Sequence, residues 1–130
     1  KFLVSMSLRA ERSNLIKYLR DCFVASLLAM TCLYCSLLRY EILSGLKYKN
    51  AEKQLAAFLQ FAEYNSIIPI TKDSIEISTD IYADLRTKGR LIDDIDILIA
   101  GIAMSNNLVL VTHNTSHFKR INGLEVEDWF

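Results

Sequence analysis

The sequence predicts a single α/β domain in which helices surround an open, mainly parallel sheet. Short β-prone runs alternate with segments of helical periodicity, which is the pattern of βαβ units. The run Leu108–Thr112 is continuously apolar until its last residue, as strands inside parallel sheets are. One Pro and four Gly in 130 residues favour long regular elements over disorder. We therefore expect residues 1–130 to form one domain.

Composition limits the size of the core and the kind of partner. A chain of 130 residues that is 52% hydrophobic is long enough to bury one real core. The formal net charge is zero, so any contact with nucleic acid must come from local clusters of Lys and Arg. The three cysteines do not make a disulfide framework in a chain of this length.

The first 38 residues contain a strand, a helix start and a long uncharged run. Lys1–Val4 is expected to be a short strand, and a helix is expected to begin at Ser13 or Asn14 as its N-cap. Residues 22–38 carry no charge. The length of this run is at the lower limit for a membrane span. Hydroxyl and thiol groups within the run favour a buried strand followed by a helix. We therefore expect no membrane segment, and a membrane-tethered small protein remains the alternative.

Two helices are expected between residues 37 and 63. Glu41 lies at the margin of the buried face of the first, and Gly45, one turn later, leaves space above its carboxylate. That face consists of Leu37, Leu38, Ile42 and Leu46. Asn50 is expected to cap the second helix. Its apolar residues have the spacing i, i+3, i+4 and i+7: Leu55, Phe58, Leu59 and Ala62.

A short strand and a third helix follow. Ser66–Ile70 is β-prone, and Pro69 within it suggests a sheet edge or a strand end. Asp73 and Glu76 resemble a capping box that opens the helix, and Gly89 is expected to end it. The inward residues of this helix are Ile77, Ile81 and Leu85.

Three acids, Asp93, Asp94 and Asp96, open the fourth helix. From Ile95 to Met104 only Asp96 is charged, so the helix is expected to be buried, and an unpaired buried charge is costly. A helix N-terminus favours anions, but three acids exceed the needs of a cap. Two charges 4 Å apart repel by about 4 kcal/mol at an effective dielectric near 20, and a divalent cation would reverse this. A metal site and an over-capped helix both remain open.

The end of the chain places a polar loop after a buried strand. The fourth helix is expected to end at Asn106-Asn107, and the strand Leu108–Thr112 then leads into a loop, His113–Ser116. Leu124–Val126 is expected to be a last strand. Because ligands bind beyond the carboxyl ends of strands in open α/β sheets, Asn114 is expected to meet the start of the acidic helix there.

Four side chains are candidates for the chemistry. Hard oxygen ligands select magnesium or manganese over zinc, and such a cation can activate water and neutralise phosphate charge. The candidates lie on separate elements, so their convergence depends on the fold. They are Glu41, Asp94, Asp96 and Asn114.

Other features favour structural roles. Cys32 and Cys35 lack a second pair or a His at zinc spacing, which favours packing over redox or zinc chemistry. His113 and His117 are expected to be surface residues, and the sequon at Asn114 matters only on secretion. Six basic residues could form a phosphate-facing rim, although scattered surface charge is the default: Lys47, Lys49, Lys53, Arg86, Lys88 and Arg90.

Four phrases, in order, resemble the PIN-domain ribonucleases and, within them, the VapC toxins of toxin–antitoxin pairs. The phrases are YEILSGL at residues 40–46, KGRLIDDIDILIA at 88–100, LVLVTHNT at 108–115 with Phe118, and GLEVEDW at 123–129. They span roughly two thirds of the chain, from about Leu37 to the end. The resemblance implies a three-layer α/β/α fold.

The resemblance also implies a magnesium-dependent endoribonuclease, often acting on tRNA, with Mn²⁺ as a possible cofactor. Position by position, Glu41 and Asp96 match the second and third acids of the family, Asp94 an auxiliary acid and Asn114 the fourth position. Glu41, Asp94 and Asp96 would be the metal ligands. The implied partners are an RNA substrate, a VapB-like antitoxin and a second copy in a homodimer, and the implied location is the cytoplasm.

The chain departs from the family at its start. The family opens with a strand that ends in Asp-Thr-Asn, whose Asp is a principal metal ligand, whereas here Ser5-Met-Ser7 follows the first strand. Residues from about 7 to 31 resemble translated interspersed repeats, and we predict an inserted or replaced segment there. The alternative function is therefore a catalytically impaired PIN domain that still binds its antitoxin.

Overall fold

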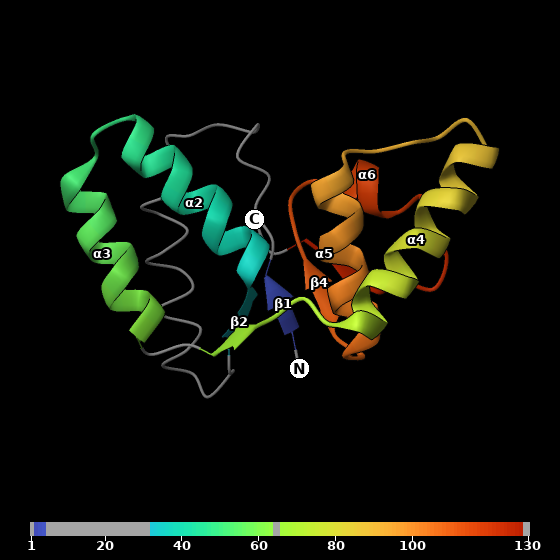
Figure 1. The fold of residues 1–130 in the computed structure, drawn as a ribbon, viewed down its shortest axis with the longest axis horizontal. Coiled ribbons are helices and arrows are strands. Elements are labelled where there is room, and N and C mark those ends of the chain that lie inside the picture. Colours follow the sequence, from blue (N-terminus) through green and yellow to red (C-terminus); the bar gives the residue numbers. More distant parts are fainter. Residues whose placement is uncertain (1, 5–31, 64–65, 129–130) are drawn as a thin grey trace.

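The computed structural model describes residues 2–4, 32–63 and 66–128. Their elements, in chain order, are β1 (Phe2–Val4), β2 (Cys32–Cys35), α2 (Ser36–Tyr48), α3 (Glu52–Glu63), β3 (Ile67–Ile68), α4 (Lys72–Thr87), α5 (Asp94–Ser105), β4 (Val109–Val111), α6 (Thr115–Phe118) and β5 (Val126–Glu127). Strands and helices alternate as the sequence predicts (Figure 1).

The five described strands form one sheet in the order β3-β2-β1-β4-β5. Every pairing is parallel, so the expected parallel sheet is confirmed. The chain moves outward from β1 to β2 and β3, and then returns to the other side of β1 with β4 and β5. Because crossovers are right-handed, this reversal sends the helices of the two halves to opposite faces. Figure 1 shows α2 and α3 on one side of the strands and α4, α5 and α6 on the other. The implied α/β/α layering is confirmed.

Helix α5 supplies the centre of the core. Its residues Ile99, Ala100, Ile102 and Ala103 are at most 1% exposed, and the strand that follows it buries Leu110 and Val111 completely. Helix α4 packs along α5. The expected buried acidic helix is therefore confirmed. The packing of its later turns and of the strand that follows fixes the position of its first turn.

Close contact between α4 and α5 depends on Gly101. A Cβ atom at this position would lie 2.0 Å from Ser78 Oγ and 2.6 Å from the carbonyl oxygen of Ser74. Ser78 is buried, and its hydroxyl donates to the Ser74 carbonyl at 2.7 Å. A polar group at this interface is thus satisfied within α4, and the missing side chain of Gly101 leaves room for it.

Residue 50 ends one helix instead of starting the next, which corrects the predicted cap of α3. Asn50 has φ 52°, and α3 begins two residues later at Glu52. The N–H of Asn50 donates to the Lys47 carbonyl, and that of Ala51 to the Leu46 carbonyl, both at 3.1 Å. This is a Schellman motif, in which a left-handed residue satisfies the last carbonyls of a helix.

The same motif ends α4 and α5. Gly89, with φ 64°, and Asn107, with φ 52°, occupy the left-handed position. Arg90 N–H donates to the Leu85 carbonyl and Leu108 N–H to the Ala103 carbonyl, each at 2.9 Å. The predicted stop at Gly89 is confirmed, and α5 ends beside Asn106-Asn107 as expected.

The capping box of α4 consists of Thr71 and Ser74, not of the predicted pair Asp73 and Glu76. Thr71 is extended, and α4 begins after it at Lys72. Ser74 N–H donates to Thr71 Oγ1 at 3.2 Å, and Thr71 N–H donates to Ser74 Oγ at 2.9 Å. Asp73 lies inside the first turn, so it can favour the helix only through the dipole.

Thr71→Ala should lower the free energy of unfolding by about 1 kcal/mol, because the Ser74 N–H loses its side-chain acceptor. Glu76→Ala is the control: it removes only an exposed pair with Lys72, worth less than about 1 kcal/mol. Urea unfolding of the two variants measures the difference. A larger loss of stability in Glu76→Ala than in Thr71→Ala would show that Asp73 and Glu76 form the cap.

The predicted strands agree with the structure better than the predicted loop does. The strands predicted at Lys1–Val4, Ser66–Ile70 and Leu108–Thr112 are confirmed within a residue or two, whereas β5 begins only at Val126. The loop predicted at His113–Ser116 is wrong in its second half, because α6 begins at Thr115. Fully buried Phe118 anchors this short helix.

The uncharged run 22–38 ends as a strand followed by a helix, β2 and the start of α2, as expected for its described part. Cys35 is fully buried in the core, in keeping with a packing role. No helix among the described residues combines the length and the hydropathy needed to span a membrane. The helix start predicted at Ser13 or Asn14 lies outside the described residues.

Candidate active site

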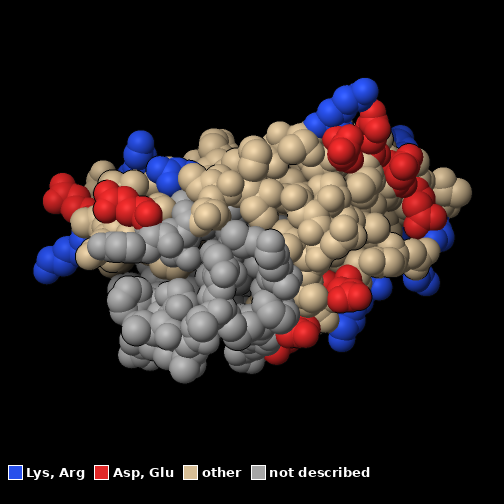
Figure 2. All heavy atoms as spheres, turned by 90° about the horizontal axis from the view of Figure 1, so that it is seen from below, with Lys and Arg blue, Asp and Glu red and all other residues tan. Residues whose placement is uncertain are grey.

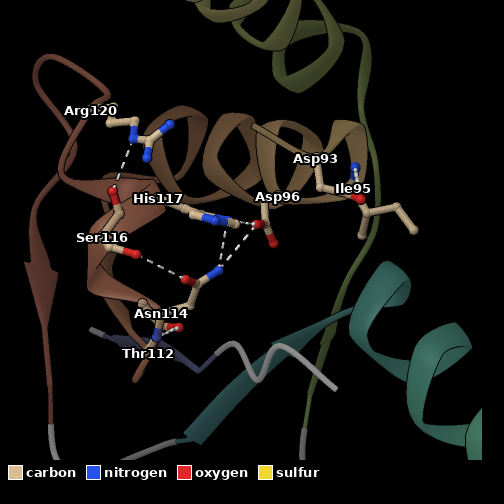
Figure 3. Close-up of polar contacts among 8 residues, drawn as sticks. All are labelled: Asp93, Ile95, Asp96, Thr112, Asn114, Ser116, His117 and Arg120. Atoms are coloured by element: carbon tan, nitrogen blue, oxygen red, sulfur yellow. Dashed lines mark hydrogen bonds and ion pairs between the residues drawn. The ribbon is translucent and has the colours of Figure 1, made fainter. Parts of the chain in front are cut away.

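The candidate site lies where the strand order reverses. β1 and β4 are neighbours, and Val4 at the end of one pairs with Val111 at the end of the other. The usual ligand site of an open α/β sheet lies at the carboxyl ends of the strands where the strand order reverses. The residues after β4 and the first turn of α5 meet at this edge (Figure 3).

Asp96 is the central side chain of the site. The residue is 8% exposed, although it lies in the first turn of an otherwise apolar helix. Asp93 already caps α5: its Oδ1 accepts the N–H of Ile95 at 3.1 Å. The cap therefore does not require Asp96, and surplus capping does not explain why this carboxylate is buried.

Two side chains from the segment after β4 contact the carboxylate. Asp96 Oδ2 lies 3.3 Å from Asn114 Nδ2 and 2.9 Å from His117 Nδ1 (Figure 3). Neither contact involves Oδ1, which accepts no hydrogen bond within the described part of the chain. The predicted meeting of Asn114 with the acidic helix is thus found.

Local structure after β4 positions Asn114 and His117. Buried Thr112 accepts the N–H of Asn114 through its Oγ1 at 3.1 Å, which turns the chain out of the strand. Helix α6 then places His117 one turn after Asn114, and the two side chains contact each other at 2.9 Å. Residues three apart share a face only on a helix, so a loop over these residues would have separated them.

His117 is the residue that the sequence reasoning missed. It was expected at the surface, but it contacts the buried acid from a side chain that is only 36% exposed. His113 does lie at the surface as expected, and its Nδ1 is 3.2 Å from Asp128. A helical interpretation of residues 114–118 would have found His117, because its spacing from Asn114 is i, i+3.

The other predicted ligands stand apart from this group. Asp94 is exposed, and residues two apart on a helix do not face each other. Glu41 lies half-buried in α2, a helix that contacts α5. Among residues 2–4, 32–63 and 66–128, no three His, Cys, Asp or Glu side chains form a group able to hold a metal ion. The roles of Glu41 and Asp94 as ligands stay predictions.

The predicted basic rim is not a continuous stripe on the face drawn in Figure 2. There, Lys and Arg lie toward the two ends of the molecule and are interspersed with Asp and Glu. Lys88 pairs with Asp84 at 2.7 Å, and Arg86 donates to the hydroxyl of Tyr82 and lies over its ring. At least these two cations have intramolecular partners, which favours the interpretation as ordinary surface charge.

The donor chemistry fits a divalent cation. A nearly buried carboxylate with one oxygen not hydrogen-bonded by a described residue, and a neighbouring amide, are hard donors of the kind that Mg²⁺ and Mn²⁺ prefer. The N-terminus of α5 adds favourable potential for the carboxylate itself. Fold and site together define a class: α/β/α domains that hold an acid at the switch point of a parallel sheet.

The PIN domain model matches residues 11–124, and the chain belongs to the PIN-domain family. The resemblance inferred from the sequence is confirmed. The match begins within the stretch expected to be atypical; residues 5–31 lie outside the described structure, so an insertion there stays a prediction.

Relatives of this chain are VapC ribonucleases. A tRNA(fMet)-specific endonuclease VapC of Shigella flexneri is 34% identical over 83 residues, which cover 64% of this chain and 63% of that relative. Ribonuclease VapC2 of Rickettsia felis is 30% identical over 102 residues, covering 78% of this chain and 74% of the relative. The chain thus spans less than two thirds of the Shigella protein.

Solved structures extend the similarity over the whole chain. VapBC2 of Rickettsia felis bound to a promoter DNA fragment aligns with a TM-score of 0.82 at 25% identity, covering 99% of this chain and 100% of that one. DNA-bound VapBC of Salmonella typhimurium aligns with a TM-score of 0.82 at 26% identity, covering 100% and 98%. Both are toxin–antitoxin complexes of the VapBC type.

Proposed function

We propose that this chain is a VapC-type toxin, an endoribonuclease that hydrolyses phosphodiester bonds in RNA with the help of Mg²⁺ or Mn²⁺. The observation that carries the proposal is Asp96, a nearly buried carboxylate that the cap of α5 does not need and that faces polar groups at the switch point. The ribonuclease relatives support the choice of RNA.

Four side chains have separate roles in the proposed mechanism. Asp96 would hold the cation, and its burial limits the access of water to the carboxylate. Asn114 contacts Asp96 through its amide, while Glu41 and Asp94 would supply further oxygen ligands from α2 and from the exposed end of α5. A bound divalent cation would neutralise charge on the phosphate and activate the attacking water.

We further propose a tRNA substrate, a VapB-like antitoxin and a cytoplasmic location. The first is supported by the tRNA(fMet)-specific relative and the second by the VapBC complexes of similar fold. A homodimer belongs to the same proposal: Ile67, Ile70 and Ile75, which follow one another along β3 and the start of α4, are each at least 39% exposed. A second copy would cover such an apolar surface.

The alternative is a PIN domain that binds its antitoxin without cutting RNA. It is favoured by the residue that follows β1. Val4, the last residue of β1, pairs with Val111 at the carboxyl edge of the sheet, and the sequence determines which residue comes next. That residue is Ser5, which lies outside the described residues. A neutral hydroxyl is a poor substitute for a carboxylate as a ligand of Mg²⁺.

Cleavage of tRNA by the purified chain, stripped with a chelator and then titrated with Mg²⁺ or Mn²⁺, tests both proposals. The active form should lose all cleavage without metal and regain it on addition. The impaired form should cut only after Ser5→Asp, because a fourth acid then joins the site. If a folded wild type and a folded Ser5→Asp variant both leave RNA intact at every metal concentration, the nuclease proposal is wrong.

A further inference from the structure

The contacts around Asp96 contain a conflict. His117 Nδ1 lies 2.9 Å from Asp96 Oδ2 and 2.9 Å from Asn114 Nδ2. In neutral His, a ring nitrogen either carries a proton and donates or offers a lone pair and accepts. If Nδ1 donates to Asp96, it faces the amide donor of Asn114 without a bond. If it accepts from Asn114, its lone pair faces the lone pairs of Asp96.

Turning the amide does not remove the conflict. A half-turn exchanges the nitrogen and oxygen of Asn114, so that His117 could donate to both oxygens. The amide oxygen would then face the carboxylate across the 3.3 Å contact, and two acceptors would repel. Three polar atoms in mutual contact therefore leave one contact unfavourable in every arrangement of neutral His117 and Asn114 that keeps Nδ1 at this position.

A cation resolves all three contacts at once. With the amide turned, Asp96 Oδ2, the Asn114 oxygen and His117 Nδ1 present lone pairs at separations of 2.9, 2.9 and 3.3 Å. Neighbouring ligands of an octahedral cation with bonds of about 2.1 Å are about 3.0 Å apart. The three positions match one triangular face of such an octahedron. The turned amide nitrogen would face Ser116 Oγ, now 3.5 Å from Oδ1, which can accept.

We propose that His117, together with Asp96 and Asn114, holds the divalent cation of this site, and that its imidazole makes the site prefer Mn²⁺ to Mg²⁺. The presence of a cation rests on the proposed function; the identity of the nitrogen ligand does not. Imidazole suits transition metals, whereas Mg²⁺ prefers oxygen donors and water. One nitrogen among the ligands therefore raises the affinity for Mn²⁺ relative to Mg²⁺.

The opposing explanation is an ion pair. A protonated His117 would neutralise Asp96 and occupy the place of the cation. The two explanations differ in sign: removal of a ligand weakens cation binding, whereas removal of a competing charge strengthens it. The same substitution therefore distinguishes them.

Titration of Mn²⁺ into wild type, His117→Ala and His113→Ala, followed through the electron paramagnetic resonance signal of free Mn²⁺, tests the proposal. Loss of even an outer-shell partner costs about 10–100-fold in metal affinity, so His117→Ala should bind Mn²⁺ at least about 10-fold more weakly. His113→Ala is the matched control, since His113 is exposed beside Asp128 and its affinity should not change. The ratio of Mn²⁺ to Mg²⁺ affinity should fall only in His117→Ala.

Electron spin-echo modulation of the bound Mn²⁺ gives a readout that does not need a variant. Wild type should show coupling to a directly bound imidazole nitrogen, and labelling of histidine with ¹⁵N should change its frequencies. Mn²⁺ bound without nitrogen coupling, or bound more tightly by folded His117→Ala, would overturn the inference and leave the proposed nuclease intact. Failure of wild type to bind Mn²⁺, with or without RNA, would instead overturn the proposed metal dependence itself.

Discussion

Asp96→Asn is expected to lower metal-dependent RNA cleavage by more than about 100-fold, beyond the upper end of the loss caused by outer-shell partners of a metal. The amide keeps the shape of the side chain but removes its charge. Since Asp96 is nearly buried and Asp93 provides the cap of α5, the helix should remain in place. Initial rates of tRNA cleavage at saturating Mg²⁺ and Mn²⁺ measure the effect, and circular dichroism checks the fold.

Asp93→Asn is the control for this substitution. It removes an acid three residues before Asp96. Because Asn caps helices about as well as Asp, the rate of cleavage should remain within about twofold of wild type. Asp94→Asn tests the auxiliary acid in the same assay. If Asp96→Asn cleaves RNA as fast as an Asp93→Asn variant of wild-type activity, the buried carboxylate has only a structural role.

Gly101→Ala should lower the stability of the fold through a steric clash between α4 and α5. The new Cβ would lie 2.0 Å from Ser78 Oγ and 2.6 Å from the Ser74 carbonyl oxygen. The hydroxyl can rotate away, but the carbonyl belongs to the backbone of α4, so the two helices must separate. Overpacking of this kind costs about 1–3 kcal/mol, partly offset by the helix propensity of Ala, which favours it over Gly by about 1 kcal/mol.

A net loss of up to about 2 kcal/mol is therefore expected from the difference of these two terms, measured as a shift of the urea midpoint. Gly89→Ala is the companion variant. No atom lies within 4 Å of the position that a Cβ would take at Gly89, but the φ of this residue is +64°, so the variant reports backbone strain without a clash. If Ser78→Ala restores no stability to Gly101→Ala, the contact with the hydroxyl contributes nothing and the carbonyl alone is responsible. A Gly101→Ala variant as stable as wild type would show that α4 and α5 adjust without cost.

Local sequence patterns predicted where elements lie better than how they begin. The buried strand at Leu108–Thr112 and the stop at Gly89 were recognised from apolar continuity and from glycine alone. The caps at Asn50 and Thr71 were misassigned because several neighbouring residues could serve. Asn can start a helix or end one, and only the backbone dihedral of Asn50, φ 52°, distinguishes the two roles.

The sequence predicted only part of the candidate site. Asp96 was recognised because a charge in an apolar helix requires an explanation, and Asn114 because it follows a buried strand. His117 was missed because α6 is only four residues long, too short to show periodicity. Its position depends on Phe118, whose burial anchors that turn.

The order of residues by itself determined the parallel α/β class, the buried acidic helix and the acid at the centre of the candidate site, because each follows from short-range patterns of apolar and polar residues. Only the tertiary structure decided that His117 joins Asn114 at this carboxylate and that Gly101 lets two helices touch. These contacts join residues 18 to 27 positions apart in the sequence. Such contacts depend on how strands and helices pack, which no local pattern encodes.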